Sequence, residues 1–405
     1  MAQRLDARER AFAHELAYGV TRLRGRLDHL LLAHVHRGLE SLDPTVHELL
    51  RIGSYQLLYL GGIPDYAAVS ETVDQVRERV GPKPAGFVNA VLRNVKEGGD
   101  GPERFPAETD EPAAFLATWG SHPRWLIERW LQRWSVQEVR ALVETNNRRP
   151  ALNLYALDVD PDEAVQVLAA GGIQSDRVGA GSACVRLAES MSPSAALAAI
   201  PRAIIQDPAA NLVARYADVP SGTKVADLCA APGGKVLAAS DRPLYTLASD
   251  RSESRIHMVR NNARRTGREM GFVVADARQP PVEAVDVVLL DVPCTGTGTL
   301  SRRPDARWRL RPESIDEMAA LQSEMLEAAA DIVTPGGVLV YSTCTLEPEE
   351  NVERVRALLR SRSDFEVEAT GSVPAEYLDP EGFLSVTPQA TGFDGAFAAR
   401  LRKAG

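Results

Sequence analysis

The sequence predicts an α-helical N-terminal domain, then a small α+β subdomain, and finally an α/β domain with a doubly wound, Rossmann-like sheet. Three observations support this order. Apolar side chains recur at helical spacing through residues 1–97, whereas residues 98–112 are rich in Gly, Pro and acidic residues, as in an exposed linker. Residues 113–220 mix helical and strand patterns. In residues 221–405, short β-branched runs alternate with helical segments, which is typical of a doubly wound parallel sheet.

The composition is that of a soluble globular chain of two or three domains. Of 405 residues, 44% are hydrophobic and 25% charged, and no apolar run approaches the roughly 20 residues of a membrane span. The N-terminal residues contain no hydrophobic segment of the signal-peptide type, so we expect a cytoplasmic protein with no membrane partner. The net charge of −9, taken alone, argues against a nucleic-acid partner, because nucleic acids are bound through Lys and Arg.

The N-terminal domain is predicted to be a helical bundle. Over residues 8–35 the apolar side chains fall on one helix face: Phe12, Leu16, Val20, Leu23, Leu27, Leu30 and Leu31. The same spacing continues over residues 45–60, which end at two glycines, and over residues 69–80.

The middle segment combines helices with short strands. Trp125, Trp130, Trp134 and Leu142 stand in helical register, and we interpret the aromatic residues as core rather than as base-stacking platforms. Strands are expected at 152–157 and 183–189, around a helix at 162–172. Cys184 falls inside the second of these strands, so we expect it to be inert.

The C-terminal domain alternates predicted strands and helices. Strands are expected at 223–228, 244–249, 271–276, 284–291 and 336–343. Helices are expected at about 234–240, 253–266, 313–333 and 349–361, and residues 365–401 should add edge strands. In open parallel sheets, ligands bind beyond the carboxyl ends of the strands.

Cysteines follow two of these strand ends. Cys294 and Cys344 each stand just past an apolar run, so both are candidates for one active site. The four cysteines form no CxxC pair and have no histidine at zinc-ligand spacing, so neither a disulfide framework nor a metal site is expected. Spacing alone does not decide which of the two thiols reacts.

The first predicted strand is followed by a loop, DLCAAPGGK, which opens a helix as nucleotide-binding loops do. It lacks the P-loop pattern, because Cys229 and Val236 stand where Gly and Ser or Thr are needed, and it is not GxGxxG. Asp250 and Asp276 end the next two strands, where they can accept hydrogen bonds from ribose hydroxyls and from adenine or a ligand amine. S-adenosylmethionine fits such a site better than NAD or ATP. The residues expected to contact it are Cys229, Ala230, Ala231, Pro232, Gly233, Gly234, Lys235, Asp250, Asp276 and Asp291.

Arginines form two clusters. Five lie between Arg302 and Arg311, directly after the Cys294 turn, and we predict that Arg302, Arg303 and Arg307 contact RNA. The second cluster lies on one predicted helix and suits a solvated face as well as a polyanion contact: Arg255, Arg260, Arg264, Arg265 and Arg268.

Four motifs, DLCAAPGGK, DVPCTGTG, PDARW and YSTCTLEPEEN, together resemble the RNA (cytosine-5)-methyltransferases of the Nol1/Nop2/Sun family. Residues 1–97 resemble a NusB-like RNA-binding domain, in AFAHELAYGV, LLRIGSYQLLYL and GPKPAGFVNAVLRNV. The combination is similar to the bacterial members that act on 16S ribosomal RNA. It implies a monomer that uses S-adenosylmethionine and takes a single-stranded or flipped cytidine.

The resemblance also implies roles for the site residues. Cys344 corresponds to the nucleophile and Cys294 to the cysteine that aids product release, whereas Cys229 is expected only to pack or to contact backbone. Asp291 is placed to stabilise the base at ring nitrogen 3, and Lys235 could support it and favour a thiolate. The alternatives are an enzyme acting on tRNA or 23S rRNA, a non-catalytic ribosome assembly factor on the same fold and, more weakly, an NAD oxidoreductase.

Overall fold

The computed structural model describes residues 5–179, 181–189, 191–239 and 243–405. The chain divides into two compact units: Met1–Arg148 with Leu300–Arg309 (unit 1), and Arg149–Thr299 with Leu310–Gly405 (unit 2). This division differs from the predicted bounds, because residues 98–112 do not separate the units. The helices that follow them pack on the N-terminal helices instead: Gly25 N donates to Ser121 Oγ at 3.0 Å, and Arg26 Nε donates to Trp119 O at 2.6 Å.

Unit 1 begins with the predicted helical bundle. Its helices are α1 (Ala7–Leu32), α2 (Pro44–Tyr59), α3 (Asp65–Arg79) and α4 (Ala85–Gly98). The side chains of Asp6 and Asp43 cap α1 and α2 by accepting hydrogen bonds from backbone N–H groups of the first turn. Leu50, Val76 and Leu92 are fully buried where α2, α3 and α4 meet.

Three further helices complete unit 1 with a segment from much later in the chain. They are α5 (Pro112–Thr118), α6 (Arg124–Leu131) and α7 (Val136–Asn147), and Leu300–Arg309 contributes the short α13 (Ala306–Arg309). Trp130 is fully buried, which supports the interpretation of this tryptophan as core.

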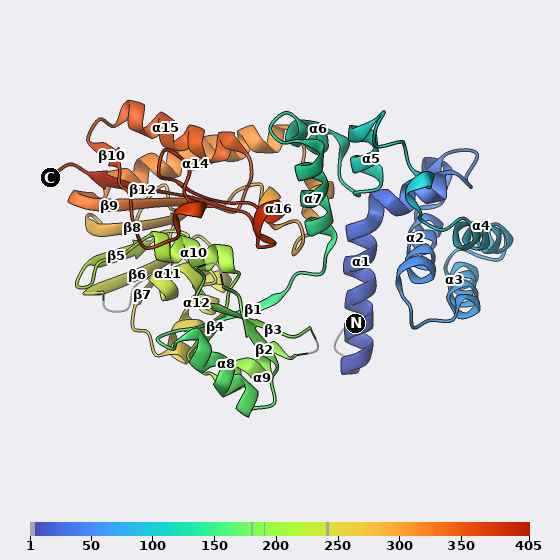
Figure 1. The fold of residues 1–405 in the computed structure, drawn as a ribbon, viewed down its shortest axis with the longest axis horizontal. Helices are drawn as coiled ribbons and strands as arrows, with labels where there is room; N and C mark the ends of the chain where they lie inside the picture. The colour runs from blue at the N-terminus through green and yellow to red at the C-terminus, as the bar shows by residue number, and fades with distance from the viewer. Residues whose placement is uncertain (1–4, 180, 190, 240–242) are drawn as a thin grey trace. The chain divides into compact units, whose positions relative to one another are not determined.

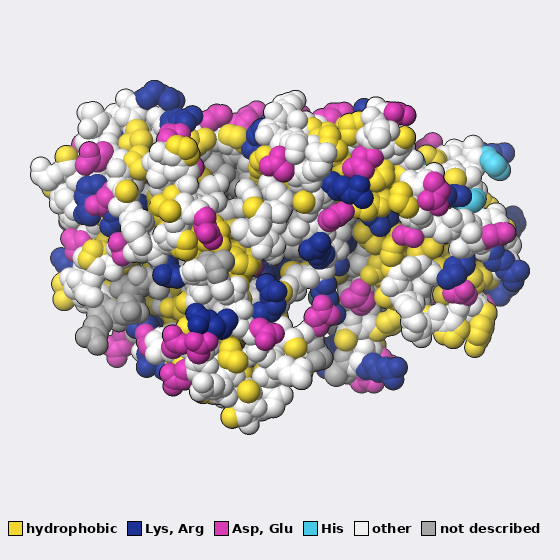
Figure 2. All heavy atoms as spheres, in the orientation of Figure 1, with side chains coloured by type: hydrophobic (Ala, Val, Ile, Leu, Met, Phe, Trp, Pro, Cys, Tyr) yellow, Lys and Arg dark blue, Asp and Glu magenta, His cyan; other side chains and the backbone are white. Residues whose placement is uncertain are grey.

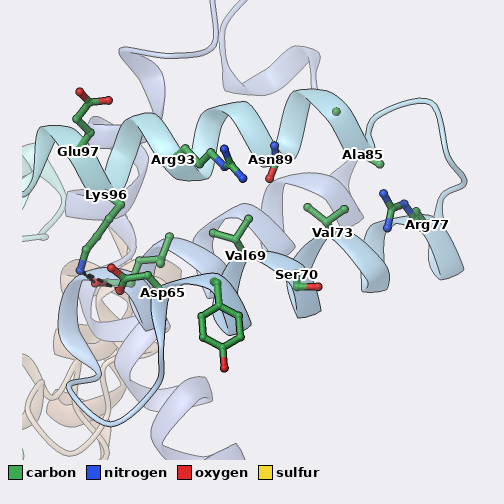
Figure 3. A pocket seen from close by; sticks show the side chains of 13 residues that line it. Asp65, Val69, Ser70, Val73, Arg77, Ala85, Asn89, Arg93, Lys96 and Glu97 are labelled. Carbon is green, nitrogen blue, oxygen red and sulfur yellow. Dashed lines mark hydrogen bonds and ion pairs between the residues drawn. The ribbon is translucent and has the colours of Figure 1, made fainter.

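A hollow of about 660 Å³ lies between α3 and α4 (Figure 3). Val69 and Val73 form part of its apolar lining, and Arg77 and Arg93 extend over it from the two helices. At one end, Lys96 Nζ lies 3.1 Å from Asp65 Oδ1. This hollow contains none of the residues predicted for catalysis or cofactor binding.

Unit 2 starts with a small antiparallel sheet in the order β2-β3-β1-β4. The strands are β1 (Leu152–Ala156), β2 (Ser175–Arg177), β3 (Cys184–Leu187) and β4 (Ala203–Ile205), with α8 (Pro161–Ala170) and α9 (Pro193–Ala199) packed on them. Cys184 is buried in β3, and burial raises its pKa to about 12, so its thiol stays protonated.

The main sheet of unit 2 has the order β10-β12-β9-β8-β5-β6-β7, with β11 also paired to β12. The parallel strands are β5 (Lys224–Asp227), β6 (Tyr245–Asp250), β7 (Gly271–Val274), β8 (Val285–Asp291) and β9 (Val333–Thr343). The last segment adds antiparallel β10 (Phe365–Val367), β11 (Leu384–Val386) and β12 (Ala396–Lys403). The doubly wound domain is confirmed.

Helices cover both faces of this sheet, as Figure 1 shows. On one face lie α14 (Glu313–Asp331) and α15 (Val352–Ser361); α11 (Gly234–Ala239) and α12 (Glu253–Thr266) lie on the other. A further helix, α10 (Pro208–Tyr216), packs on α11 and on β12. Side chains of β8 alternate between the two cores: Val288 and Leu290 pack toward α14, and Val287 and Leu289 toward α11 and α12. Residue 240 of the predicted helix 234–240 is outside the described part of the chain.

Charged side chains of both signs are interspersed over the face shown in Figure 2. Among the described residues, no helix has the length and apolar character that crossing a membrane requires.

Candidate active site

Two neighbouring parallel strands bring Cys294 and Cys344 together. Each cysteine follows the carboxyl end of its strand, β8 or β9, and their Sγ atoms lie 3.3 Å apart. The backbone N–H of Cys344 also donates to Cys294 Sγ at 3.4 Å. Both cysteines are free thiols and partly exposed. The prediction that the two strand ends form one site is therefore consistent with this geometry.

The pKa values of the two thiols shift in opposite directions. The hydrogen bond to Cys344, burial and the carboxylate of Glu350 all raise the pKa of Cys294. The same hydrogen bond lowers the pKa of Cys344; burial and Asp291 oppose this, and Lys235 adds to the lowering. Cys344 is therefore the more readily ionised thiol, and the thiolate is the nucleophilic form of cysteine.

An ion pair lies at the end of β8. Lys235 Nζ is 2.7 Å from Asp291 Oδ2, and Ser342 Oγ donates to Asp291 Oδ1 at 2.9 Å. Burial disfavours the charged ammonium, but Asp291 outweighs this effect and the pKa of Lys235 is raised. The site thus combines a protonated amine with a carboxylate within electrostatic reach of Cys344.

The loop after β5 lines a hollow of about 160 Å³. The strand order reverses here, because the chain runs from β5 to β6 and β7 in one direction and continues through β8 and β9 in the other. Such switch points are where open α/β sheets bind ligands. Residues predicted for the cofactor that line the hollow are Cys229, Ala230, Ala231, Pro232, Gly234, Lys235 and Asp291, and Ile205, Gln206 and Asp207 join them.

The loop is held by side chains from outside it. Gln206 Nε2 donates to Gly234 O at 2.8 Å, and an Arg255 guanidinium nitrogen donates to Ala231 O at 2.9 Å. Gly233 adopts φ +105°, and a Cβ there would lie 3.2 Å from Val259 Cγ1. Burial and the neighbouring Asp227 raise the pKa of Cys229, so its thiol remains protonated.

The two strand-end aspartates predicted for the adenosine do not line the hollow. Asp250 is only 3% exposed, and it accepts a hydrogen bond from Ser252 N at 3.0 Å. Asp276 pairs with Arg278, at 2.8 Å between Oδ2 and a guanidinium nitrogen, and this pairing lowers the pKa of Asp276 to about 2. In this structure the Asp276 carboxylate is therefore occupied by a side chain of the protein itself.

The predicted RNA-contacting arginines differ in exposure. Arg303 is exposed and Arg302 is half-buried. Arg307, in contrast, is 0% exposed, and its guanidinium donates to buried oxygens of unit 1: Arg22 O, Ser121 O, Asn146 O, Asn147 Oδ1 and Leu300 O. The prediction that Arg307 contacts RNA is wrong, because every one of these bonds would have to break first.

The arginines of α12 make contacts inside unit 2. Arg265 donates to Pro201 O at 2.9 Å, Arg268 to Asp158 Oδ1 at 2.9 Å, and Arg260 lies over the ring of Phe272. Together with the Arg255 bond to the cofactor loop, these contacts favour a structural role for most of this cluster.

No role was predicted for Glu350, although YSTCTLEPEEN contains it. Its carboxylate is fully buried directly behind both cysteine loops and accepts hydrogen bonds from Thr295, Gln322 and Thr345. The only sequence signal was its place in that motif, because an acidic run after a turn is usually solvated.

Three known families match successive parts of the chain. The family described as 16S rRNA methyltransferase RsmB/F matches residues 217–402, and the NusB family matches residues 1–97. The ferredoxin-like domain of RsmF/B-like methyltransferases matches residues 122–193.

Individual relatives agree with these matches. The ribosomal RNA small subunit methyltransferase B of Cronobacter sakazakii is 33% identical over 414 residues, which cover 100% of this chain and 92% of the relative. The crystal structure of PH0851 superposes with a TM-score of 0.80 at 26% identity, over 99% of this chain and 91% of that chain. NSun6 from Pyrococcus horikoshii with SFG shares the fold, with a TM-score of 0.58 at 19% identity over 69% of this chain and 97% of that chain.

Proposed function

Because the chain belongs to the RsmB/F family of 16S rRNA methyltransferases, we propose that it methylates carbon 5 of a cytidine in 16S ribosomal RNA. The methyl donor is S-adenosylmethionine, and the reaction proceeds through a covalent bond between the base and Cys344. One observation carries the proposal: two thiols of opposite pKa shift lie 3.3 Å apart at adjacent strand ends. Carbon 5 of cytosine is a poor nucleophile, and addition of a thiolate at carbon 6 makes it reactive.

The residues around the hollow fit S-adenosylmethionine in their chemistry. Ile205 and Pro232 offer apolar surface to an adenine ring. Asp250, at the end of β6, does not line the hollow and contacts Ser252 N and Arg255; we assign it to the ribose hydroxyls, which replace Arg255 when they bind. Asp227 lines the hollow, and in its ionised form it is an acceptor for an ammonium group. When bound, the cofactor supplies an electrophilic methyl group.

In the first step the Cys344 thiolate adds to carbon 6 of a cytosine that has left its stack. The added electron pair moves toward ring nitrogen 3, where a proton is needed. We assign Asp291 to that nitrogen, with Lys235, 2.7 Å away, as the source of the proton. The resulting enamine takes the methyl group at carbon 5.

In the second step a base removes the proton from carbon 5, and the bond between carbon 6 and Cys344 breaks. Cys294 carries a proton that its raised pKa retains, and it lies 3.3 Å from the departing sulfur. A hydrogen bond from Cys294 stabilises the thiolate as it leaves. This chemistry gives the two cysteines different roles, one covalent and one assisting.

Small-subunit ribosomal RNA is favoured over tRNA and 23S rRNA, because relatives named as small-subunit ribosomal RNA methyltransferases match the chain from end to end. A non-catalytic assembly factor is disfavoured by the set of reactive groups. Both thiols, Asp291 and Lys235 are present and adjacent, whereas a protein freed from catalysis has no need to retain them.

Single substitutions of the two cysteines test the proposal. With 16S rRNA and S-adenosylmethionine, Cys344→Ala is expected to yield neither 5-methylcytidine nor an adduct that survives denaturing gels. Cys294→Ala should instead accumulate such an adduct and release product slowly, since losing a hydrogen bond to a charged sulfur, about 1.5 to 3 kcal/mol, slows a step about 10- to 150-fold. Cys184→Ala, in the small sheet, is the matched control and should behave as the unmodified protein.

The opposite pattern, an adduct with Cys344→Ala and none with Cys294→Ala, would exchange the two roles. Methylation of a base position other than cytosine carbon 5, detected by mass spectrometry of digested RNA, would refute the proposed reaction.

A further inference from the structure

A single buried carboxylate connects the two loops that carry the cysteines. Glu350 ends the short helix η5 (Pro348–Glu350), and its side chain is 0% exposed. Its Oε2 accepts from the backbone N–H of Thr295 at 2.9 Å and from Gln322 Nε2 at 2.9 Å. Its Oε1 accepts from the hydroxyls of Thr295 and Thr345, the latter at 3.0 Å. Both carboxylate oxygens are thus fully engaged.

The partners of Glu350 are adjacent to the reacting groups in sequence. Thr295 directly follows Cys294, and Thr345 directly follows Cys344. The two threonine hydroxyls also lie 2.8 Å apart. Movement of either loop would therefore break a hydrogen bond to the same carboxylate, and in a buried site such a broken bond leaves a costly unsatisfied group. Gln322 anchors the carboxylate to α14 and also donates to Pro293 O at 2.9 Å.

We propose that Glu350 is a positioning residue, which fixes the spacing of Cys294 and Cys344 and keeps the shared proton on Cys294. The inference rests on the proposed function for its catalytic meaning, since only a covalent mechanism needs one thiolate beside one thiol. Glu350 itself touches neither the base nor the cofactor in this scheme.

The charges around the two thiols support this distribution of the proton. Cys294 faces Glu350 and Tyr341, and the negative charge of Glu350 raises the pKa of Cys294. Burial raises the pKa of Glu350, whereas the hydrogen bonds that it accepts from the Thr295 N–H and from Gln322 Nε2 favour its ionised form.

At Cys344 the hydrogen bond with Cys294 is the largest influence and lowers the pKa, against the effect of burial. Lys235 lowers the pKa of Cys344, whereas Asp291 and Asp394 raise it. If Glu350 is replaced by a neutral residue, its negative charge no longer raises the pKa of Cys294, and the difference between the pKa values of the two thiols becomes smaller.

The test compares Glu350→Gln with Glu353→Gln, an exposed carboxylate three residues later. Alkylation of each thiol by iodoacetamide is followed by mass spectrometry from pH 6 to pH 10, without RNA. In the unmodified protein and in Glu353→Gln, Cys344 should react faster than Cys294. In Glu350→Gln the ratio of the two rates should fall about tenfold, as for a relative pKa change of about one unit.

A methylation assay on the same proteins adds a second readout. Glu350→Gln should lower kcat about tenfold or more while leaving the dissociation constant of S-adenosylmethionine unchanged, because the thiols are no longer held in position and the cofactor hollow is intact. A folded Glu350→Gln protein with an unchanged thiol-rate ratio would overturn the inference.

If Glu350→Gln does not fold, Thr345→Val tests the positioning role of Glu350 instead. This variant keeps the carboxylate but removes the bond from the Cys344 loop, and a fall of about threefold in the thiol-rate ratio is expected. An unchanged ratio in folded Thr345→Val would contradict the inference. The thiol measurements need no RNA, so failure of the unmodified protein to methylate RNA would refute the proposed function separately.

Discussion

Protonation of Asp227, the last residue of β5, contributes to the free energy of unfolding. It is 1% exposed, and its Oδ1 accepts from Cys229 N at 3.2 Å. Burial and the nearby Asp291 raise its pKa from 3.8 to about 7. Between these two values the folded chain holds a proton that the unfolded chain has released. The contribution to stability is therefore fully present below about pH 3.8 and is lost as pH rises through about 7.

Asp227→Asn should accordingly stabilise the protein, and more so at alkaline pH. An amide keeps the acceptor for Cys229 N but never ionises. Each pKa unit corresponds to about 1.4 kcal/mol, so the gain in unfolding free energy should grow by roughly 2 to 3 kcal/mol between pH 5 and pH 8. Urea unfolding at the two pH values measures it. An equal gain at both would show that the pKa of Asp227 is not raised.

At the scale of single elements, the central strands could be predicted because their pattern is local. β8 and the second half of β9 are apolar runs rich in Val and Leu, and a turn that contains a cysteine follows each strand. Parallel pairing of these two strands therefore brings Cys294 and Cys344 together. The two strands missed in the small sheet, β2 and β4, have three residues each and carry no periodicity to detect.

The environments of the loop residues were not predictable, because burial there depends on tertiary packing. Arg307 and Glu350 both stand in charged, proline-containing runs that look exposed. In the fold each is fully buried and hydrogen-bonded on several sides, one in unit 1 and the other in unit 2. Sequence patterns reflect a residue's neighbours along the chain, whereas the burial of Arg307 and Glu350 depends on hydrogen-bond partners that are distant in sequence.

Gly298 lies where its own loop meets the loops that contain Cys344 and Gly395, and this close approach gives a prediction. Its N–H donates to Cys344 O at 3.1 Å, and its carbonyl accepts from Gly395 N at 2.7 Å. A Cβ at this position would lie 2.7 Å from Gly395 Cα and 2.8 Å from Cys344 O, both of them backbone atoms. Gly298→Ala should therefore displace Cys344 and lower kcat by one to two orders of magnitude, as misplacement of about 1 Å does.

Gly371→Ala is the matched control, since nothing lies within 4 Å of a Cβ there. Binding of S-adenosylmethionine, followed by calorimetry, should be little changed in both variants. Normal turnover by Gly298→Ala would mean that the loops shift together and keep their alignment.

At the scale of the whole molecule, each compact unit is built from two separate segments of the chain, which the composition does not predict. The Gly- and Pro-rich residues 98–112 predict a boundary after the NusB-like domain, whereas the compact unit 1 continues to Arg148 and includes Leu300–Arg309. This segment leaves unit 2 a few residues after Cys294 and returns to it at Leu310. It carries the exposed Arg303 and the half-buried Arg302, which keeps both as candidates for binding phosphates.

Replacing Arg302 and Arg303 with Ala should weaken RNA binding and flatten its dependence on salt. The slope of log K against log salt should change by roughly 0.7 to 0.9 for each RNA phosphate that the variant no longer neutralises. Cofactor affinity should stay constant. Arg307→Ala serves as the contrast: it leaves buried carbonyls without donors, so its main effect should be a lower melting temperature. An unchanged salt slope in the double variant would identify these two arginines as solvated surface.

The recruitment of Leu300–Arg309 also sets an order of events during synthesis on the ribosome. The chain emerges from its N-terminus, so α1 to α7 are complete when Arg148 has been made, but the guanidinium that joins their carbonyls comes roughly 150 residues later. At about 5 to 20 residues per second, this delay is on the order of ten to thirty seconds. Through that interval the carbonyls of Ser121 and Asn146 lack the Arg307 donor and are accessible to water or to a chaperone, so unit 1 is completed only after Leu300–Arg309 has been synthesised.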